Sequence, residues 1–208
     1  MTVLTPQNFP KPRGWKRVQA ILDFWFDSPW TPGSEYGQQR QCWFKKDAAF
    51  DTQLRQKFEP DYQQAKAGNL DIWQQHPKAC LALVLLLDQV PRNIFRGSAQ
   101  SFATDSKALA VAQSGLDQGW DSYLIAVERI FLYLPFEHSE NLADQYQSLR
   151  LFTALVGENP ELQTTLDYAQ KHLDIVQRFG RFPHRNEILD RPNTAAETEF
   201  LKQPGSRF

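Results

Sequence analysis

The sequence predicts an all-α protein, built as an antiparallel array of helices. Apolar residues recur at helical spacing along nearly the whole chain, and almost no segment alternates apolar and polar residues as a strand does. Glycines, prolines and capping residues divide this pattern into about eight or nine helical segments with short connections. Short connections place consecutive helices side by side and antiparallel. No fixed-length repeat is evident in the residues themselves.

The N-terminal half is expected to contain an extended arm and three helices. Three prolines lie in residues 1–14, so residues 1–16 are predicted as an extended arm and residues 17–208 as a single helical domain. Residues 17–27 are apolar on several sides and form a buried first helix. Asp47 can cap the second helix, which Gly68 ends. Pro77 suits the first position of a third helix, which covers the apolar run 79–87 and which Pro91 is expected to end.

The C-terminal half is expected to contain five more helices, over residues 104–119, 122–134, 141–156, 160–179 and 194–201. Thr104 is the predicted cap of the first of these helices, and Pro135 is expected to stop the second. The helix over 160–179 is apolar on a wide arc, which is typical of a helix wedged between neighbours. Thr194 and Glu197 have the spacing of a capping box at the start of the last helix.

Composition narrows the classes of function. The chain is 41% hydrophobic and 23% charged, as is ordinary for a globular protein, and its formal net charge of −1 argues against nucleic-acid or anionic-membrane binding. The apolar run 79–87 is too short to span a bilayer, and the N-terminus lacks the apolar stretch of a signal peptide. Cys42 and Cys80 form no metal or redox motif, so a reduced, cytoplasmic protein is expected.

Three polar segments, each at the end of an apolar helical pattern, indicate a site. They are DQVPRNIFRG at 88–97, YLPFEHSE at 133–140 and RFGRFPHRN at 178–186. Helix ends in an up-and-down array meet at one rim, where side chains from distant segments can line a pocket. We therefore expect Arg92, His138, His184 and at least one of Arg181 and Arg185 to converge.

The acid–base candidates are His138, His184 and Glu137. His138 lies between Glu137 and Glu140, and a neighbouring carboxylate can favour the imidazolium or select one tautomer of the ring. The alternative is that this segment is only a turn between helices. His184 lies between two arginines that would lower its pKa unless an anion binds there.

The ligand-binding candidates are rich in arginine, whose planar fork matches carboxylate and phosphate oxygens. The arginines could equally pair with nearby acids or with helix C-terminal carbonyls, and Arg92 could pair with Asp88. A lone histidine such as His172, on the buried face of a helix, is more often a core residue. The full set of ligand-binding candidates is Arg92, Asn93, Glu140, His172, Arg181, Arg185 and Asn186.

No cofactor or metal is predicted. The chain has no GxGxxG, P-loop or GxSxG motif and no HExxH motif, although Glu137, His138 and Glu140 lie close together in sequence. Neither cysteine has a sequence-adjacent base. Nucleophilic catalysis is therefore unsupported, and whether the protein is an enzyme remains open.

The three polar segments, together with ILDFWF at 21–26 and the tail from Ile188 to Leu201, resemble an uncharacterised bacterial family, domain of unknown function 924. The resemblance covers roughly residues 17–201. The family usually has glycine at the position of Asp190 and serine or a similar residue at that of Asn193. The resemblance implies an all-helical fold similar to tetratricopeptide-repeat arrays, with degenerate repeats, and implies no established activity.

Two hypotheses about function follow. The first is a cytosolic protein whose Arg/His/Glu pocket binds a small anionic or carboxylate ligand, with acid–base or hydrolytic chemistry if it is an enzyme. The second is a helical-repeat scaffold that binds a peptide or protein partner, with the polar segments locking helix ends together. Convergence of the polar side chains on one cavity would favour the first hypothesis, and their dispersal into separate turns the second.

Overall fold

Every regular element in the described part of the chain is a helix. The structure, a computed structural model, describes residues 9–43 and 45–207. Within these ranges the backbone forms α-helices, short 3-10 helices and one π-helical turn, and it forms no strand. The predicted all-α class is therefore confirmed. Residues 1–8 of the predicted arm lie outside the described residues, and residues 9–14 precede the first helix.

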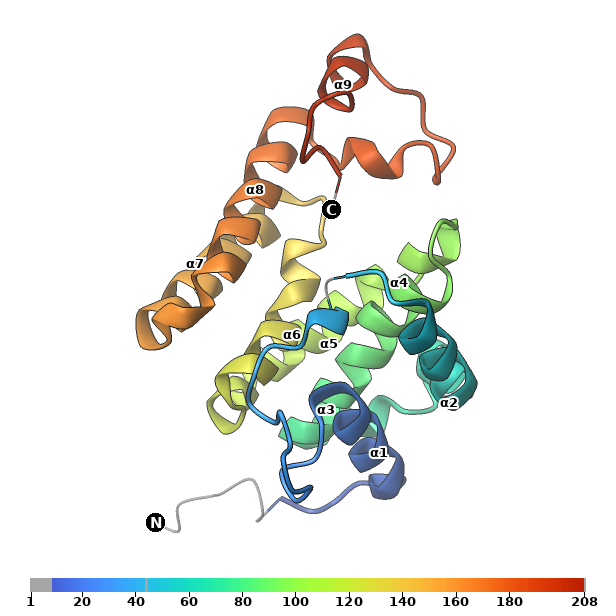
Figure 1. The fold of residues 1–208 in the computed structure, drawn as a ribbon, viewed down its shortest axis with the longest axis vertical. Coiled ribbons are helices and arrows are strands. Elements are labelled where there is room, and N and C mark those ends of the chain that lie inside the picture. The colour runs from blue at the N-terminus through green and yellow to red at the C-terminus, as the bar shows by residue number, and fades with distance from the viewer. Residues whose placement is uncertain (1–8, 44, 208) are drawn as a thin grey trace.

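The α-helices follow one another in the order labelled in Figure 1. They are α1 (Trp15–Phe26), α2 (Ala48–Lys66), α3 (Pro77–Val84), α4 (Val90–Ile94), α5 (Asp105–Asp117), α6 (Ala126–Glu137), α7 (Leu142–Glu158), α8 (Gln163–Phe179) and α9 (Ala195–Phe200). The 3-10 helices are η2 (Gln41–Trp43), η3 (Asp71–Gln75), η5 (Ala99–Phe102), η6 (Trp120–Tyr123), η7 (Pro160–Leu162) and η8 (Pro183–Arg185). Figure 1 shows α7 and α8 side by side along one flank, with α9 at the opposite end of the molecule from α1.

The main apolar core surrounds α3. Residues 79–87 all have 0% of their surface exposed, and α1, α5 and α6 pack around this segment. A helix that is apolar on all sides is stable only when it is enclosed in this way. Helix α7 packs on both α6 and α8, and a smaller apolar cluster of Ile175, Val176 and Phe182 ties the end of α8 to the C-terminal segment.

Several predicted helix starts are confirmed by their capping contacts. The side chain of Asp47 accepts hydrogen bonds from the N–H groups of Ala49 and Phe50 at the start of α2. Thr194 and Glu197 form the predicted capping box at the start of α9. These starts were predictable because a cap depends on residues only two or three positions away.

The prediction that Pro91 ends the third helix is wrong. The helical path runs from α3 through a π-helical turn, η4 (Leu85–Gln89), into α4, which contains Pro91. Proline has no N–H, so it cannot donate to the carbonyl of Leu87, four residues earlier. The hydroxyl of Thr104 donates to that carbonyl at 2.5 Å and supplies the missing hydrogen bond. Thr104 precedes α5 as predicted, but its side chain does not cap that helix.

We expect Thr104→Val to lower the free energy of unfolding by about 1–3 kcal/mol, because it leaves a buried carbonyl without a donor at nearly constant side-chain volume. Thr104 is only 4% exposed. Urea denaturation measures the change. The control is Thr153→Val on the exposed side of α7, where the hydroxyl bonds to the Leu149 carbonyl and the expected change is about 0.5 kcal/mol or less. Equal losses in the two variants would contradict the role given to Thr104.

The prediction that Pro135 stops a helix is also wrong. Pro135 lies inside α6, which begins at Ala126 because the 3-10 helix η6 occupies the expected start. The N–H of His138 reaches the carbonyl of Leu134 at 2.9 Å, so the helical hydrogen bonds continue past the proline. Burial of the apolar side chains of α6 outweighs the local cost of the proline, about 3 kcal/mol. As a result, Glu137 and His138 lie at the end of α6 itself.

Candidate functional site

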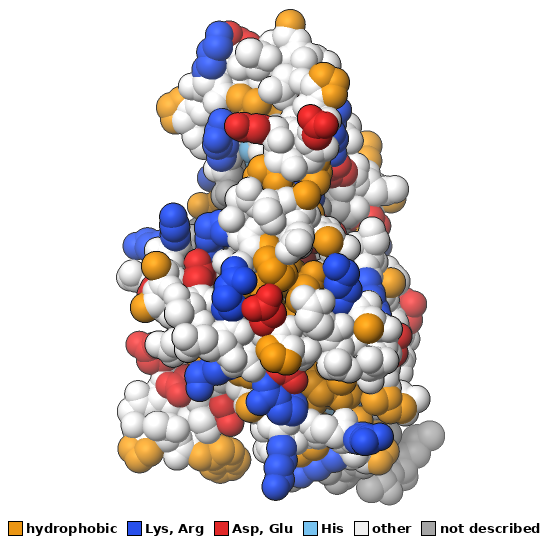
Figure 2. Space-filling model, turned by 90° about the vertical axis from the view of Figure 1, so that its right-hand side faces the viewer, with side chains coloured by type: hydrophobic (Ala, Val, Ile, Leu, Met, Phe, Trp, Pro, Cys, Tyr) orange, Lys and Arg blue, Asp and Glu red, His pale blue; other side chains and the backbone are white. Residues whose placement is uncertain are grey.

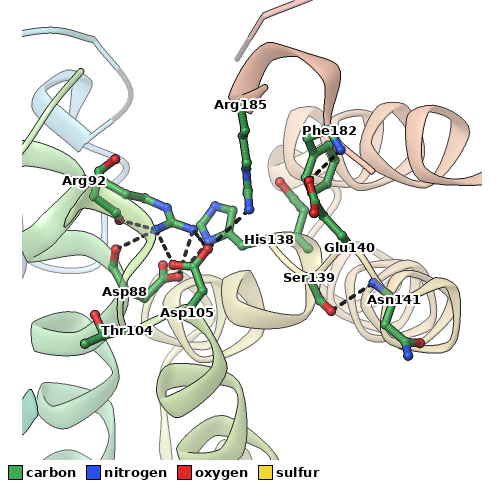
Figure 3. A network of polar contacts seen from close by, with 12 residues as sticks. Asp88, Arg92, Thr104, Asp105, His138, Ser139, Glu140, Asn141, Phe182 and Arg185 are labelled. Carbon is green, nitrogen blue, oxygen red and sulfur yellow. Dashed lines mark hydrogen bonds and ion pairs between the residues drawn. The ribbon is translucent and has the colours of Figure 1, made fainter. Parts of the chain in front are cut away.

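An aspartate and a histidine from distant segments form the centre of the candidate site. Asp88 lies in the π-helical turn η4 and has 0% of its surface exposed, and His138 follows the last residue of α6. His138 Nδ1 is 2.7 Å from Asp88 Oδ1, and the side-chain amide of Gln89 donates to Asp88 Oδ2 at 2.6 Å. Figure 3 shows the pair where η4, α5 and α6 meet. A π-turn commonly marks a functional position in a helix.

The electrostatic surroundings determine where the proton of this pair lies. Burial opposes ionisation of Asp88, but the positive charge of Arg92 and the contact with His138 hold its pKa well below the usual range. Burial, and then the charge of Arg92, lower the pKa of His138. An ionised carboxylate only accepts hydrogen bonds, so the hydrogen of the neutral ring lies on Nδ1. Nε2 then carries a lone pair, and none of the described residues donates to it.

Arg92 joins Asp88 to a second carboxylate. Its guanidinium donates to both oxygens of Asp105, at 2.8 and 3.0 Å, and lies 3.4 Å from Asp88 Oδ1. It also donates to the main-chain carbonyls of Asp88 and Ser101, at 3.2 Å each. With its hydrogen-bond donors used in this way, Arg92 orders the two aspartates and has little capacity left for a ligand.

Arg185 approaches the same cluster from η8. Its guanidinium lies between the rings of Phe102 and Phe182, 4.6 and 4.5 Å from their centroids. The side chain is 8% exposed, and Nη1 donates to Asp105 Oδ2 at 3.3 Å. The buried Nε has no hydrogen-bond partner among the described residues. Burial and the charge of Arg92 lower the pKa of Arg185 to about 10, which leaves a cation with unused donors at neutral pH.

A cavity of about 350 Å³ opens beside these groups. His138, Arg185, Asp105 and Glu140 contribute polar atoms to its wall, and apolar side chains make up much of the rest. This volume is sufficient for a small molecule, and an apolar wall with a few convergent polar groups is typical of ligand pockets. The arrangement can hold an anion at Arg185 beside a basic ring nitrogen.

Glu137 and His172 form a second buried pair behind His138. His172 Nδ1 lies 2.8 Å from the carbonyl oxygen of Tyr168 and 3.2 Å from Glu137 Oε1. Burial lowers the pKa of His172 to about 3, and burial together with the charge of Asp88 raises the pKa of Glu137 to about 8. Both side chains are therefore neutral near pH 7. The rings of His172 and His138 meet edge to face, with centroids 6.4 Å apart.

Glu140 holds the C-terminal segment against the end of α6. One of its oxygens accepts the N–H of Phe182 at 2.8 Å, and Arg191 pairs with both oxygens at 2.7 and 2.9 Å. Asn186 supports this clasp by accepting from Arg191 at 2.9 Å and donating to Asn193 at 2.7 Å. The clasp holds the segment from which Arg185 reaches the cavity wall, where Glu140 also lies.

The backbone of Asp190 explains why glycine suits this position of the C-terminal loop. Its φ is 52°, in the left-handed region that favours glycine. Asp190 lies within the turn between Asn186 and Arg191, whose backbone groups are joined by a 2.8 Å hydrogen bond. The aspartate thus occupies a backbone conformation that favours the glycine expected of the family.

Three other predicted site residues lie outside this cluster. Arg181 pairs with both carboxylate oxygens of Glu197, at 2.6 and 2.8 Å, and lines a separate cleft of about 610 Å³ beside α9. The His184 ring packs beside Phe182, with centroids 5.7 Å apart, and is not among the residues that line the 350 Å³ cavity. Asn93 is buried in α4. The larger cleft has no histidine in its wall, so the smaller cavity is the better candidate for acid–base chemistry.

The structure thus brings Arg92, His138 and Arg185 together, and it adds Asp105, which the sequence analysis missed and which joins the two arginines. Asp88 was expected only as an alternative partner of Arg92, and that i, i+4 pairing is found. Its second role, orienting His138, was expected of Glu137 and Glu140. Nothing in the local sequence connected Asp105 to either arginine. Among the described residues, no group of three or more potential metal ligands is placed to hold an ion.

The fold and the cluster define an all-helical protein with a buried Asp–His–Arg site beside a cavity. Residues 21–205 match the model of the family described as bacterial protein of unknown function (DUF924), and the chain belongs to this family. It is similar to the solved structure of a protein of unknown function from Agrobacterium tumefaciens. The two are 39% identical with a TM-score of 0.80, over 91% of this chain and 98% of the other. A search of curated proteins finds no match.

Proposed function

We propose that this protein binds a small organic anion in the 350 Å³ cavity and performs acid–base chemistry on it with His138 as the base. One observation carries the proposal: a histidine oriented by a buried aspartate lies in a cavity wall beside an incompletely paired arginine. A neutral imidazole held in one tautomer is the form that a general base requires.

Each group of the cluster has a distinct role in this chemistry. Nε2 of His138 takes a proton from the ligand, or from a water molecule that attacks the ligand, and returns it later in the reaction. Asp88 stabilises the imidazolium formed in between, because its carboxylate accepts from Nδ1 throughout. Arg185 binds the anionic group, and Arg92 keeps both aspartates in place.

The alternative is a peptide- or protein-binding scaffold whose helical repeats are arranged as in tetratricopeptide-repeat folds. The pairing of Arg181 with Glu197 and of Arg191 with Glu140 favours it, because such pairs lock helix ends together. Exposed Tyr146 on α7 and Tyr168 on α8 could then contribute to a partner surface. This alternative gives no reason for an arginine that is buried beside a cavity with unused donors.

We place the protein in the cytoplasm, acting on a small molecule and not on nucleic acid. On the face shown in Figure 2, Lys and Arg side chains are interspersed with Asp and Glu and form no continuous basic stripe. A nucleic-acid surface would need such a stripe. None of the described helices is both long and apolar enough to cross a membrane.

We expect small carboxylates or phosphate to raise the melting temperature of the protein, and Arg185→Gln to abolish the effect. A ligand that binds only the native state adds about 2.7 kcal/mol of stability at a hundredfold excess over Kd. Thermal shift at constant ionic strength measures this, with each variant compared to its own ligand-free state. Arg178→Gln, which removes an exposed arginine, is the matched control and should keep the full shift.

A second readout tests His138. The ring must stay neutral in the complex to act as a base, so binding should take up little or no proton, measured by titration calorimetry in buffers of different ionisation enthalpy. Proton uptake in the wild type that His138→Gln removes would mean that the bound anion protonates the ring, and it would contradict the role of His138 as the base. Equal thermal shifts in wild type, Arg185→Gln and Arg178→Gln would show only a general salt effect and would favour the scaffold.

A further inference from the structure

We propose that the ligand is a small monocarboxylate with an apolar body, and that its carboxylate binds between Arg185 and the N-terminal amides of α5. This inference rests on the proposed function and names the class of ligand. It depends on four features of the cavity: an uncapped helix end, the arginine beside it, the charge balance of the cluster, and the apolar wall.

The first turn of α5 has backbone donors without acceptors. The amides of Asp105, Ser106 and Lys107 donate to none of the described residues. The N-cap residue, Thr104, makes no side-chain cap hydrogen bond, and its hydroxyl donates to the Leu87 carbonyl. Free amides at a helix N-terminus form a favourable environment for an anion.

Arg185 is the second, independent indication of an anion here. Its side chain is nine-tenths buried, Nη1 pairs with Asp105, and the buried Nε has no hydrogen-bond partner among the described residues. A buried guanidinium with unpaired donors destabilises the folded state unless a ligand accepts hydrogen bonds from those donors. Asp105 and Ser106 of the first turn of α5 line the same cavity as Arg185. The amides and the guanidinium can therefore serve one ligand.

The charges of the cluster favour a ligand with a single negative charge. The cations of Arg92 and Arg185 are matched by the carboxylates of Asp88 and Asp105. The start of a helix adds roughly half a positive charge. A monoanion complements this surplus, whereas the carboxylates of Asp105 and Glu140 in the cavity wall would repel a phosphate dianion about twice as strongly.

The remaining wall of the cavity fits a carbon skeleton. Phe102, Leu109, Pro135 and Leu189 all line it. An inorganic anion would leave these apolar side chains in contact with water, while the chain of an organic acid would cover them. His138 also lines this cavity, so its ring is the base available to a bond near the carboxylate.

The test is titration calorimetry of the full-length protein with acetate, butanoate, hexanoate and inorganic phosphate at constant ionic strength. We expect affinity to rise about threefold to fourfold for each methylene that is buried, and phosphate to bind more weakly than butanoate. Ser106→Asp places a carboxylate at the start of α5, where acids favour helix formation, and should weaken butanoate binding about tenfold or more. Ala110→Asp adds the same charge at an exposed position later in α5 and should leave affinity unchanged.

The outcomes separate this inference from the proposed function. If phosphate binds as tightly as butanoate, or if affinity does not rise with the length of the carbon chain, the proposed ligand class is wrong. The cavity would then still be a binding site for an anion. Butanoate binding that needs Arg185 but is unaffected by Ser106→Asp would overturn the α5 site. If none of the four anions binds the wild type, the proposed function itself fails. A tenfold loss in Ser106→Asp with none in Ala110→Asp, together with the chain-length trend, would support the inference.

Discussion

Replacing Asp88 with asparagine is expected to lower the free energy of unfolding by about 3–5 kcal/mol at neutral pH. Asp88 is fully buried, and its charge balances the Arg92 guanidinium at 3.4 Å while it accepts from His138 at 2.7 Å. The substitution preserves size but removes the negative charge. Arg92 then shares the single carboxylate of Asp105 with Arg185, and a buried positive charge remains uncompensated.

The effect of Asp88→Asn should depend on pH in one direction. The pKa of Asp88 is lower in the folded state than its ordinary value of 3.8. A carboxyl group with a lowered folded pKa contributes stability that is fully present above its unfolded pKa and is lost as pH falls toward the folded pKa. The difference in the free energy of unfolding between wild type and Asp88→Asn should therefore be constant from pH 7 to about pH 5. It should become smaller as the pH falls below about 4.

Urea denaturation at pH 7, 5 and 3 measures these differences. Asp51→Asn is the matched control, because Asp51 also pairs with an arginine, Arg96, but at a site where the arginine is 43% exposed. Exposed pairs contribute about 1 kcal/mol or less. If Asp88→Asn loses no more stability than Asp51→Asn, the contacts of Asp88 with Arg92 and His138 do not hold the cluster together.

The sequence predicted the helical class and the capped helix starts because both depend on local patterns. The caps at Asp47 and Thr194 need only residues within one turn. The two proline predictions failed because each proline was judged by its own helix alone. At Pro91 the missing donor comes from Thr104, a residue 17 positions from the Leu87 carbonyl it serves. At Pro135 the burial of the apolar side chains of α6 outweighs the tendency of proline to end a helix.

The site was predictable in its parts but not in its pairings. Each polar segment contributes at least one residue to the cluster, namely Arg92, His138 and Arg185. The partner of His138 was expected among its neighbours in sequence, yet it is Asp88, 50 positions away. Adjacent residues of a helix point in different directions, so Glu137 faces His172 rather than the ring beside it in sequence. Pairings of this kind depend on how the helices cross, which a single sequence does not reveal.

Replacing Glu137 with glutamine is expected to make the protein more stable at pH 8, with little change at pH 5. Burial raises the pKa of Glu137 from 4.5 to about 8, so the folded state holds a proton that the unfolded chain releases above pH 4.5. The folded state then binds more protons than the unfolded state, and stability falls as pH rises from about 5 to 8. Glutamine keeps an oxygen that can accept from His172 Nδ1 and does not titrate. The gain at pH 8 should exceed that at pH 5 by roughly 3 kcal/mol.

The measurement is the free energy of unfolding in urea at half-unit steps from pH 5 to pH 8, with the wild-type value subtracted from that of Glu137→Gln. The unfolded-state protonation of His172 affects both proteins alike, so the difference isolates Glu137. Glu140→Gln is a control for which the opposite change is expected. Burial alone would raise the pKa of Glu140, but its hydrogen bonds with Arg191 and Phe182 lower it below the ordinary value. This variant should therefore lose stability at neutral pH. If the difference in the free energy of unfolding between Glu137→Gln and wild type does not change from pH 5 to pH 8, Glu137 is ionised in the folded state. The carboxylate would then pair with a protonated His172, whose Nδ1 lies 3.2 Å from Glu137 Oε1.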